Sequence, residues 1–470
     1  MQSTTAPRTG RWSGLFCSGL ASSLAFAPLY LFFIFFFSLN LLLESLDSSR
    51  SSKEALLSGW IFGFGYFMGN CYWFYSPLLV EPVKYAWLIP FALTLIPSFL
   101  ACYIALTTLS TWLLRKFIEN RFYITVVFAI FWTVFEIARG ILATGFAWNL
   151  VGYSLAFCPL LLQTVSIFGS HLFGFLLLIL YSSPYPLKRR EYRRYSVFYC
   201  SVLLLLVGFG LVRLKNAGQI QSSYLVRLVQ PNLAQEAKMD GEQFDDIVED
   251  MLNISLEGAE GIDYIVWPET ALPHPISFGG KNRILQIIGD RFGKSRVLVT
   301  GALRIERACP EIFNSLIVIR DSKIVDYYDK YHLAPFGEFI PFSDLFTFLT
   351  AITGIGNFSR ARVKGKLIEI DSRFPIFSPS ICYESIFIDS VNRGGGARLI
   401  VNVTNDAWLG RTSGPYQHFN ALRFRALESH MPAIRVANSG ISGVVDKYGR
   451  VLRKTKLGRR EVIDVRIPLY

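Results

Sequence analysis

Hydrophobic residues are distributed very differently in the two halves of this chain. Up to about residue 214 they form long uncharged runs, whereas from about residue 220 apolar and charged residues alternate as in a globular domain. A helix needs roughly 20 apolar residues to cross the hydrocarbon core of a bilayer. Runs of suitable length occur at approximately 12–27, 28–44, 55–78, 85–114, 122–142, 159–182 and 195–214. The pattern predicts a transmembrane domain of about seven helices over residues 1–215.

The second half shows the shorter period of strands, interrupted by helices. Runs rich in Val, Ile, Tyr and Phe predict strands at 224–229, 263–266, 296–300, 316–319, 324–328, 375–381, 399–403, 433–436 and 443–445. Helical spacing appears twice: Phe244 with Ile247, Val248 and Met251, and Phe419 with Leu422 and Ala426. Such alternation is typical of an α/β layered domain, which we predict over residues 220–470.

Composition and charge indicate a membrane protein and give it an orientation. Of the 470 residues, 52% are hydrophobic and only 17% are charged, with a formal net charge of +12. Basic residues gather in the loops on one side of the predicted spans: Arg50 and Lys53, then Arg115, Lys116 and Arg121, then the 188–194 cluster. Because cytoplasmic loops carry the excess of Lys and Arg, we predict a cytoplasmic N-terminus and an exported second domain. A cleavable signal peptide is an alternative that leaves this orientation unchanged.

The placement of cysteine and histidine argues against a metal site or a disulfide framework. Neither the seven cysteines nor the five histidines show ligand spacing, so we predict no metal and no cofactor. A disulfide between Cys309 and Cys382 is an alternative that would silence a thiol nucleophile. The basic clusters carry no nucleic-acid motif, so nucleic acid is not a predicted partner.

Two further features leave alternatives open. Glu136 and Arg139 lie one turn apart near the end of the fifth predicted span. They form either an ion pair at the interface or a feature that shapes lipid access, since charges at membrane depth are costly. Residues 342–358 are rich in apolar side chains without a clear period. This segment is either a buried connection or a loop whose tip enters the bilayer and covers an apolar ligand.

Three short segments of the second half carry candidate catalytic residues: Val266–Thr270, Tyr328–Glu338 and Ile381–Ser385. They offer the carboxylate of Glu269, the ammonium of Lys330 and the thiol of Cys382. A base that takes the thiol proton and a cation that stabilises an oxyanion are the parts of a thiol-based acyl-transfer site. Each residue alone has an ordinary structural explanation, and a Cys–His pair with His332 or His418 as the base is an alternative.

At these segments the chain resembles the apolipoprotein N-acyltransferase family, bacterial inner-membrane enzymes of the nitrilase superfamily. The resemblance rests on the three segments together with Thr144–Ser154, Val229–Asn232, Asn405–Gly410, Gly414–His418 and Asn438–Ser442. It implies a multi-span transmembrane helical bundle followed by a nitrilase-like αββα sandwich, with the catalytic domain on the periplasmic side. It also implies a base at Glu269, an oxyanion partner at Lys330 and a nucleophile at Cys382, with Glu338, Tyr383 and Glu384 assisting or contacting substrate.

The reaction that this resemblance implies has two halves. Cys382 would take an acyl chain from a phospholipid as a thioester, and the free amine of a diacylglyceryl-cysteine on a lipoprotein would then accept it. A membrane-tethered amidase of the nitrilase type and a non-catalytic lipoprotein-binding module are alternatives. The apolar 342–358 segment argues against the first, and the intact Glu–Lys–Cys set argues against the second. The sequence makes no prediction of oligomeric state.

The chain departs from the family pattern in three places. Met239 stands where the family usually has Trp, and Ala147 stands where it usually has Pro. The family ends in another membrane helix, whereas this sequence stops at Tyr470. We expect the chemistry not to depend on that last difference.

Overall fold

A computed structural model describes residues 8–218, 222–235, 244–277, 282–306, 311–341 and 358–469. The chain divides into two compact units, Met1–Asn216 and Ala217–Tyr470. Three features discussed above lie outside the described residues: Met239, Cys309 and positions 342–357 of the apolar segment.

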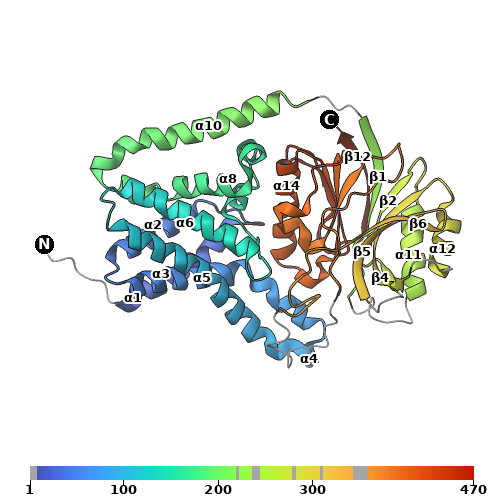
Figure 1. Cartoon of the computed structure of the whole chain (residues 1–470), viewed down its shortest axis with the longest axis horizontal. Coiled ribbons are helices and arrows are strands. Elements are labelled where there is room, and N and C mark those ends of the chain that lie inside the picture. Colours follow the sequence, from blue (N-terminus) through green and yellow to red (C-terminus); the bar gives the residue numbers. More distant parts are fainter. Residues whose placement is uncertain are drawn as a thin grey trace. The chain divides into compact units, whose positions relative to one another are not determined.

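The first unit is helical, and its long helices fall on the apolar runs of the sequence (Figure 1). Its α-helices are α1 (Arg8–Ser22), α2 (Ile34–Ser48), α3 (Ser52–Asn70), α4 (Pro82–Tyr85), α5 (Ile89–Arg115), α6 (Arg121–Ile141), α7 (Pro159–Leu162), α8 (Val165–Tyr181), α9 (Pro184–Leu187) and α10 (Ser196–Lys215). Polar side chains begin two of them, because Ser51 accepts a hydrogen bond from the backbone of Glu54 and Asn120 accepts one from Phe122.

Four helical stretches are long and apolar enough to cross a membrane within the described part of the chain. They are Pro82–Arg115, Arg121–Ile141, Val165–Leu187 and Arg193–Lys215. Large apolar side chains face outward on the last of these, where Leu204 is 70% exposed and Leu205 is 72% exposed. Such exposure is unfavourable in water and favourable in lipid. The total of seven spans stays a prediction.

Helices α3 and α5 pack closely because α3 presents glycine at their contact. A Cβ on Gly59 would lie 2.7 Å from the carbonyl oxygen of Ile104, and one on Gly63 would lie 3.0 Å from the Cα of Ala101. Small residues four positions apart let two membrane helices approach backbone to backbone. The packing of this unit therefore follows from the sequence of α3 as well as from its hydrophobicity.

The charged pair near the end of α6 is buried and binds the segment that follows. The guanidinium of Arg139 donates to the carbonyl oxygens of Phe146 and Trp148, at 2.8 Å each. The carboxylate of Glu136 accepts from the backbone N–H of Val151 at 3.0 Å and lies 3.9 Å from Arg139 Nη2. Both side chains thus hold the irregular stretch after α6 in place.

Replacing Arg139 by leucine is expected to destabilise the helical unit by about 3–5 kcal/mol, because a buried carboxylate loses its cation. The measurement is thermal unfolding of the detergent-solubilised protein, followed by tryptophan fluorescence. The exposed Arg50 provides a matched control as Arg50→Leu, for which we expect no shift. An Arg139→Leu protein as stable as the wild type would contradict a stabilising role for the buried pair of Arg139 and Glu136.

The second unit is built from two β-sheets (Figure 1). Its strands are β1 (Ser222–Gln230), β2 (Tyr264–Val266), β3 (Leu272–Ile276), β4 (Val297–Glu306), β5 (Glu311–Arg320), β6 (Lys323–Asp329), β7 (Phe377–Ile381), β8 (Leu399–Thr404), β9 (Ala433–Ala437), β10 (Gly443–Val445), β11 (Val451–Lys454) and β12 (Glu461–Leu469). The larger sheet has the order β12-β1-β2-β4-β5-β6 with β3 beside β4, and the smaller has the order β11-β10-β9-β8-β7.

Helices cover the outer faces of the two sheets and complete the αββα sandwich that we predicted. Apolar side chains of both sheets, such as Val299 and Val401, form one core between them. Helices α11 (Phe244–Leu256) and α12 (Arg283–Phe292) pack on the larger sheet, and α14 (Gly414–Ser429) packs on the smaller. Each sheet contains parallel pairs, β1 with β2 and β7 with β8 among them. Their carboxyl ends meet at common edges, which is where such sheets place their sites.

Candidate active site

Cys382 directly follows β7 and begins a short 3-10 helix, η7 (Cys382–Ile386). Its φ is +48°, a left-handed conformation that costs a residue with a side chain about 1–3 kcal/mol. Its carbonyl oxygen accepts hydrogen bonds from Ser385 Oγ at 3.1 Å and from His418 Nε2 at 3.0 Å. The turn at the end of the strand thus presents a partly buried thiol in a strained backbone.

Glu269 lies just after β2, which the sequence Trp267-Pro268 closes. Its carboxylate is buried, with Oε1 accepting from Asn314 Nδ2 and Oε2 from the backbone N–H of Asn405, both at 2.7 Å. Gly301 on the adjacent strand makes room for this turn, because a Cβ there would lie 2.5 Å from the Cα of Glu269. Asn314 and Asn405 therefore fix the orientation of the carboxylate, and Gly301 leaves the space for its turn.

Lys330 follows β6, and its ammonium lies between two buried carboxylates. Nζ is 2.9 Å from Glu338 Oε1 and 3.5 Å from Glu269 Oε1, and the lysine is only 1% exposed. The amide nitrogen of Asn314 donates to Glu338 as well as to Glu269, again at 2.7 Å. Burial by itself would lower the pKa of Lys330, but the charges of Glu338 and Glu269 outweigh it and raise that pKa. The ammonium stays charged.

The thiol of Cys382 is held in its neutral form. Burial raises its pKa, and the charge of Glu269 raises it further, against the opposing effect of Lys330. A neutral thiol can attack a carbonyl carbon only after a base has taken its proton.

Glu384 is fully buried and connects the segment of Lys330 to that of Cys382. Its Oε1 accepts from the hydroxyl of Tyr328 at 2.7 Å and from the backbone N–H groups of Tyr331 and His332 at 2.8 and 3.1 Å. Its Oε2 accepts from the backbone N–H of Ile381 at 2.8 Å. These bonds hold the segment of Lys330 and the segment of Cys382 together. The neighbouring Tyr383 is partly exposed, with its ring 5.2 Å from that of Phe387.

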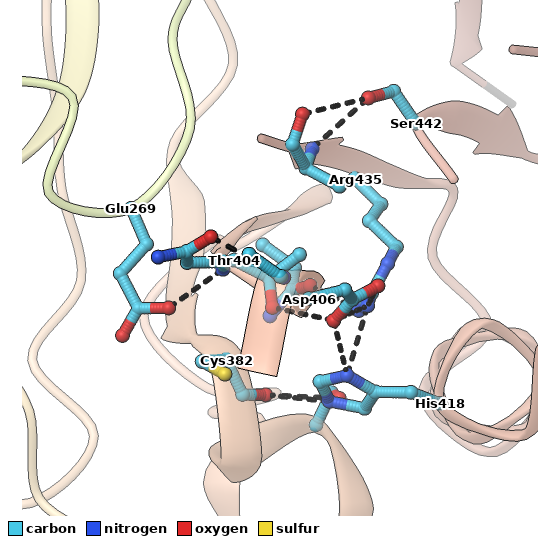
Figure 2. Close-up of polar contacts among 12 residues, drawn as sticks. Glu269, Cys382, Thr404, Asp406, His418, Arg435 and Ser442 are labelled. Atoms are coloured by element: carbon cyan, nitrogen blue, oxygen red, sulfur yellow. Dashed lines mark hydrogen bonds and ion pairs between the residues drawn. The ribbon is translucent and has the colours of Figure 1, made fainter. Parts of the chain in front are cut away.

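The two histidines considered as bases have other contacts. His332 Nε2 lies 3.3 Å from Asp389, and its ring stacks on Phe387. His418 Nε2 bonds the carbonyl oxygen of Cys382, not its sulfur (Figure 2). The described contacts of both rings are therefore with groups other than the sulfur.

Asn314, Asp406 and Arg435 were not predicted as site residues. Asn314 lies within β5 and bridges the two carboxylates, while Asp406 and Arg435 form a buried cluster with His418 beside Cys382 (Figure 2). Asn314 and Arg435 are polar residues inside apolar strands, and this position in the sequence could have marked them as candidate site residues. No group of three or more side chains suited to a metal ion occurs among the described residues.

Comparison with known proteins agrees with this architecture. Residues 18–182 match the family model described as the apolipoprotein N-acyltransferase N-terminal domain, and residues 225–470 match that of carbon-nitrogen hydrolase. The apolipoprotein N-acyltransferase of Brucella melitensis is 36% identical, with 96% of this chain and 89% of that protein covered. That of Rickettsia prowazekii is 34% identical, with 96% and 90% covered.

A solved structure of a Saccharomyces cerevisiae member of the nitrilase superfamily is 16% identical, with a TM-score of 0.41 over 54% of this chain and 93% of that one. The family assignment rests on the sequence relatives and on the two domain matches. This chain is an acyltransferase and belongs to the apolipoprotein N-acyltransferase family.

Proposed function

We propose that the protein transfers an acyl chain from a membrane phospholipid to the free α-amine of the diacylglyceryl-cysteine at the N-terminus of a lipoprotein. The acyl group would pass through a thioester on Cys382. The observation that carries this proposal is the buried group of Glu269, Lys330 and Glu338, of which Glu269 and Lys330 shift the pKa of the Cys382 thiol. The names of the relatives support the lipoprotein as acceptor.

In the first half-reaction Glu269 takes the thiol proton as Cys382 Sγ attacks the ester carbonyl of the phospholipid. The Lys330 ammonium stabilises the oxyanion of the tetrahedral intermediate, an interaction that is typically worth about 2.7–4 kcal/mol. The intermediate collapses to the thioester, and the leaving alkoxide takes the proton from Glu269 and departs as lysophospholipid. Glu338 keeps Lys330 in position through their 2.9 Å contact.

In the second half-reaction the neutral amine of the lipoprotein attacks the thioester. Glu269 accepts a proton from the attacking amine and returns it to the departing thiolate of Cys382. The N–C bond of an amide forms, the C–S bond breaks, and the enzyme regains its resting state. Two successive substrates on one thiol predict ping-pong kinetics.

The same proposal gives the chain a place in the cell. Residues 1–215 would form the transmembrane domain of about seven helices, and residues 220–470 the catalytic domain on the periplasmic side of the inner membrane. Support comes from the four apolar helical stretches and from the basic loops on the side of the N-terminus. A cytoplasmic N-terminus follows.

The direct test supplies purified protein with phospholipid and a synthetic diacylglyceryl-cysteine peptide, and detects the acylated peptide by mass spectrometry. A matched peptide whose α-amine is acetylated should stay unmodified. Release of free fatty acid at the same rate with or without the peptide, and no acylated peptide, would favour the membrane-tethered amidase instead.

Replacing Glu269 by glutamine is expected to have opposite effects on two reactions of the same thiol. Acyl transfer should fall by about 10²–10⁴-fold, because the general base is lost. Alkylation of Cys382 by iodoacetamide near pH 8 should become faster, because the charge that raised the pKa of the thiol has gone and more thiolate is present. Exposed Glu257 supplies the control as Glu257→Gln. Slower alkylation of the Glu269→Gln protein would contradict the proposed electrostatics.

A further inference from the structure

A residue of helix α14 helps to hold the strained turn at Cys382. A φ of +48° is rare for a residue with a side chain, so surrounding contacts must fix it. Ser385, one of the two donors to the Cys382 carbonyl, belongs to the same short helix as Cys382. The other donor, His418, lies on α14. The bond from His418 therefore connects the nucleophile to the helix that covers the smaller sheet.

The ring of His418 is itself fixed by a buried ion pair. Asp406 Oδ1 and Arg435 Nη2 each lie 2.9 Å from His418 Nδ1, and Arg435 Nη2 is 2.7 Å from Asp406 Oδ2 (Figure 2). Arg435 also donates to the side chain of Asn402 at 2.8 Å. All of these residues are at most 2% exposed. Removing the imidazole would leave a buried charged pair and a backbone carbonyl without their shared neighbour.

The contact with Cys382 requires a hydrogen on Nε2 of His418. A carbonyl oxygen can only accept, so the Nε2 that faces Cys382 must donate. Nδ1 lies 2.9 Å from both Asp406 Oδ1 and Arg435 Nη2, and burial followed by the charge of Arg435 lowers the pKa of His418. Both ring nitrogens therefore contact groups other than the thiol.

We propose that His418 is a positioning residue that fixes the left-handed turn of Cys382 and thereby aims Sγ at the attacked carbonyl. Asp406 and Arg435 hold the imidazole in the orientation that this bond requires. The inference rests on the proposed role of Cys382 as the nucleophile. Because a misplacement of about 1 Å can cost roughly 10²-fold in rate, loss of the bond slows thioester formation without weakening phospholipid binding.

The test measures the single-turnover rate of thioester formation on Cys382 against phospholipid concentration. His418→Leu removes the donor at similar size, whereas the amide nitrogen of His418→Gln can reach the position of Nε2 and donate. We expect the leucine variant to react about 30–100-fold more slowly at saturating phospholipid, with half-saturation changed less than about threefold. The glutamine variant should stay within about fivefold of the wild type. His274→Leu, at a partly exposed histidine of the same unit, is the matched control.

The pH dependence separates positioning from acid–base catalysis. The rate should fall in His418→Leu with the shape of its pH profile unchanged, because Glu269 still takes the proton. Equal losses in the leucine and glutamine variants, or a profile that loses its acidic limb, would overturn the proposal.

A second variant covers the case in which His418→Leu does not fold. Ser385→Ala removes the other donor to the same carbonyl and should slow thioester formation about three- to tenfold, and more strongly when combined with His418→Gln. A double variant at the wild-type rate overturns the inference. If Cys382→Ala still transfers acyl groups, the proposed function fails as well; if it is inactive while His418→Leu reacts normally, only this inference fails.

Discussion

Replacing Cys382 by alanine is expected to abolish acyl transfer, with a loss on the order of 10⁵-fold or to below detection, because the thiol that carries the acyl chain is lost. The fold should be retained, since the thiol is only partly buried and the backbone contacts of the turn do not involve the sulfur. The measurement is formation of acylated peptide from phospholipid and a diacylglyceryl-cysteine peptide.

The controls for this variant separate reactivity from folding. Cys382→Ser places a hydroxyl where the thiol was. A hydroxyl is a much weaker nucleophile at neutral pH, so the serine variant should be nearly as inactive as the alanine variant. Cys102→Ala, at an exposed cysteine of the helical unit, should retain wild-type activity. Unchanged activity in Cys382→Ala would remove the proposed mechanism.

Replacing Lys330 by methionine is expected to damage stability and activity together. Its ammonium lies 2.9 Å from Glu338 and 3.5 Å from Glu269, so its loss leaves two buried carboxylates facing each other. Breaking a buried pair costs about 3–5 kcal/mol, and removing one oxyanion donor slows reactions about 10²–10³-fold. Thermal unfolding and single-turnover acylation measure the two effects separately.

A double variant distinguishes the two roles of Lys330. Lys330→Met with Glu338→Gln removes one of the facing charges, so part of the stability should return while the acylation rate does not. The exposed Lys323 at the start of β6 is the matched control as Lys323→Met. Recovery of activity in the double variant would contradict an electrostatic role for the ammonium.

The sign of the pKa shift also fixes how this stability depends on pH. Because the pKa of Lys330 is raised in the folded protein, its stabilising effect is fully present below the unfolded pKa of about 10.4 and is lost only as the pH rises through the higher folded value. The contribution of the Lys330 ammonium to the stability of the wild type should therefore stay nearly constant from about pH 6 to 9.

The sequence was sufficient for most of the fold where local pattern decides it. Val-, Ile- and Tyr-rich runs were confirmed as β1, β4 and β8, and the apolar runs of the first half contain its long helices. Strand β3 was missed because Leu272–Ile276 contains two prolines in five residues. Strand β12 was missed because its partner is β1, more than 200 residues away. Such pairing depends on the whole fold.

The site, like the fold, has parts that local sequence pattern predicts and parts that only the structure shows. The position of Glu269 and Cys382 at strand ends could be predicted, because each comes just after an apolar strand. The two strands belong to different sheets, so the packing of one sheet on the other, which local pattern does not show, brings the two residues together. Arg435, in the middle of the buried strand Ala433–Ala437, was not recognised as a site residue, although a cation in an apolar strand needs a carboxylate nearby. Only the structure identifies that partner as Asp406, 29 residues earlier in the chain.

The central claim is that a membrane phospholipid acylates Cys382 before any lipoprotein binds. The most direct measurement incubates the purified protein with phospholipid alone and maps acyl adducts by mass spectrometry, before and after treatment with hydroxylamine. We predict one acyl chain, on Cys382, that hydroxylamine releases and that moves to a diacylglyceryl-cysteine peptide when the peptide is added. Absence of an adduct on Cys382, or an adduct that never reaches the peptide, would contradict the account.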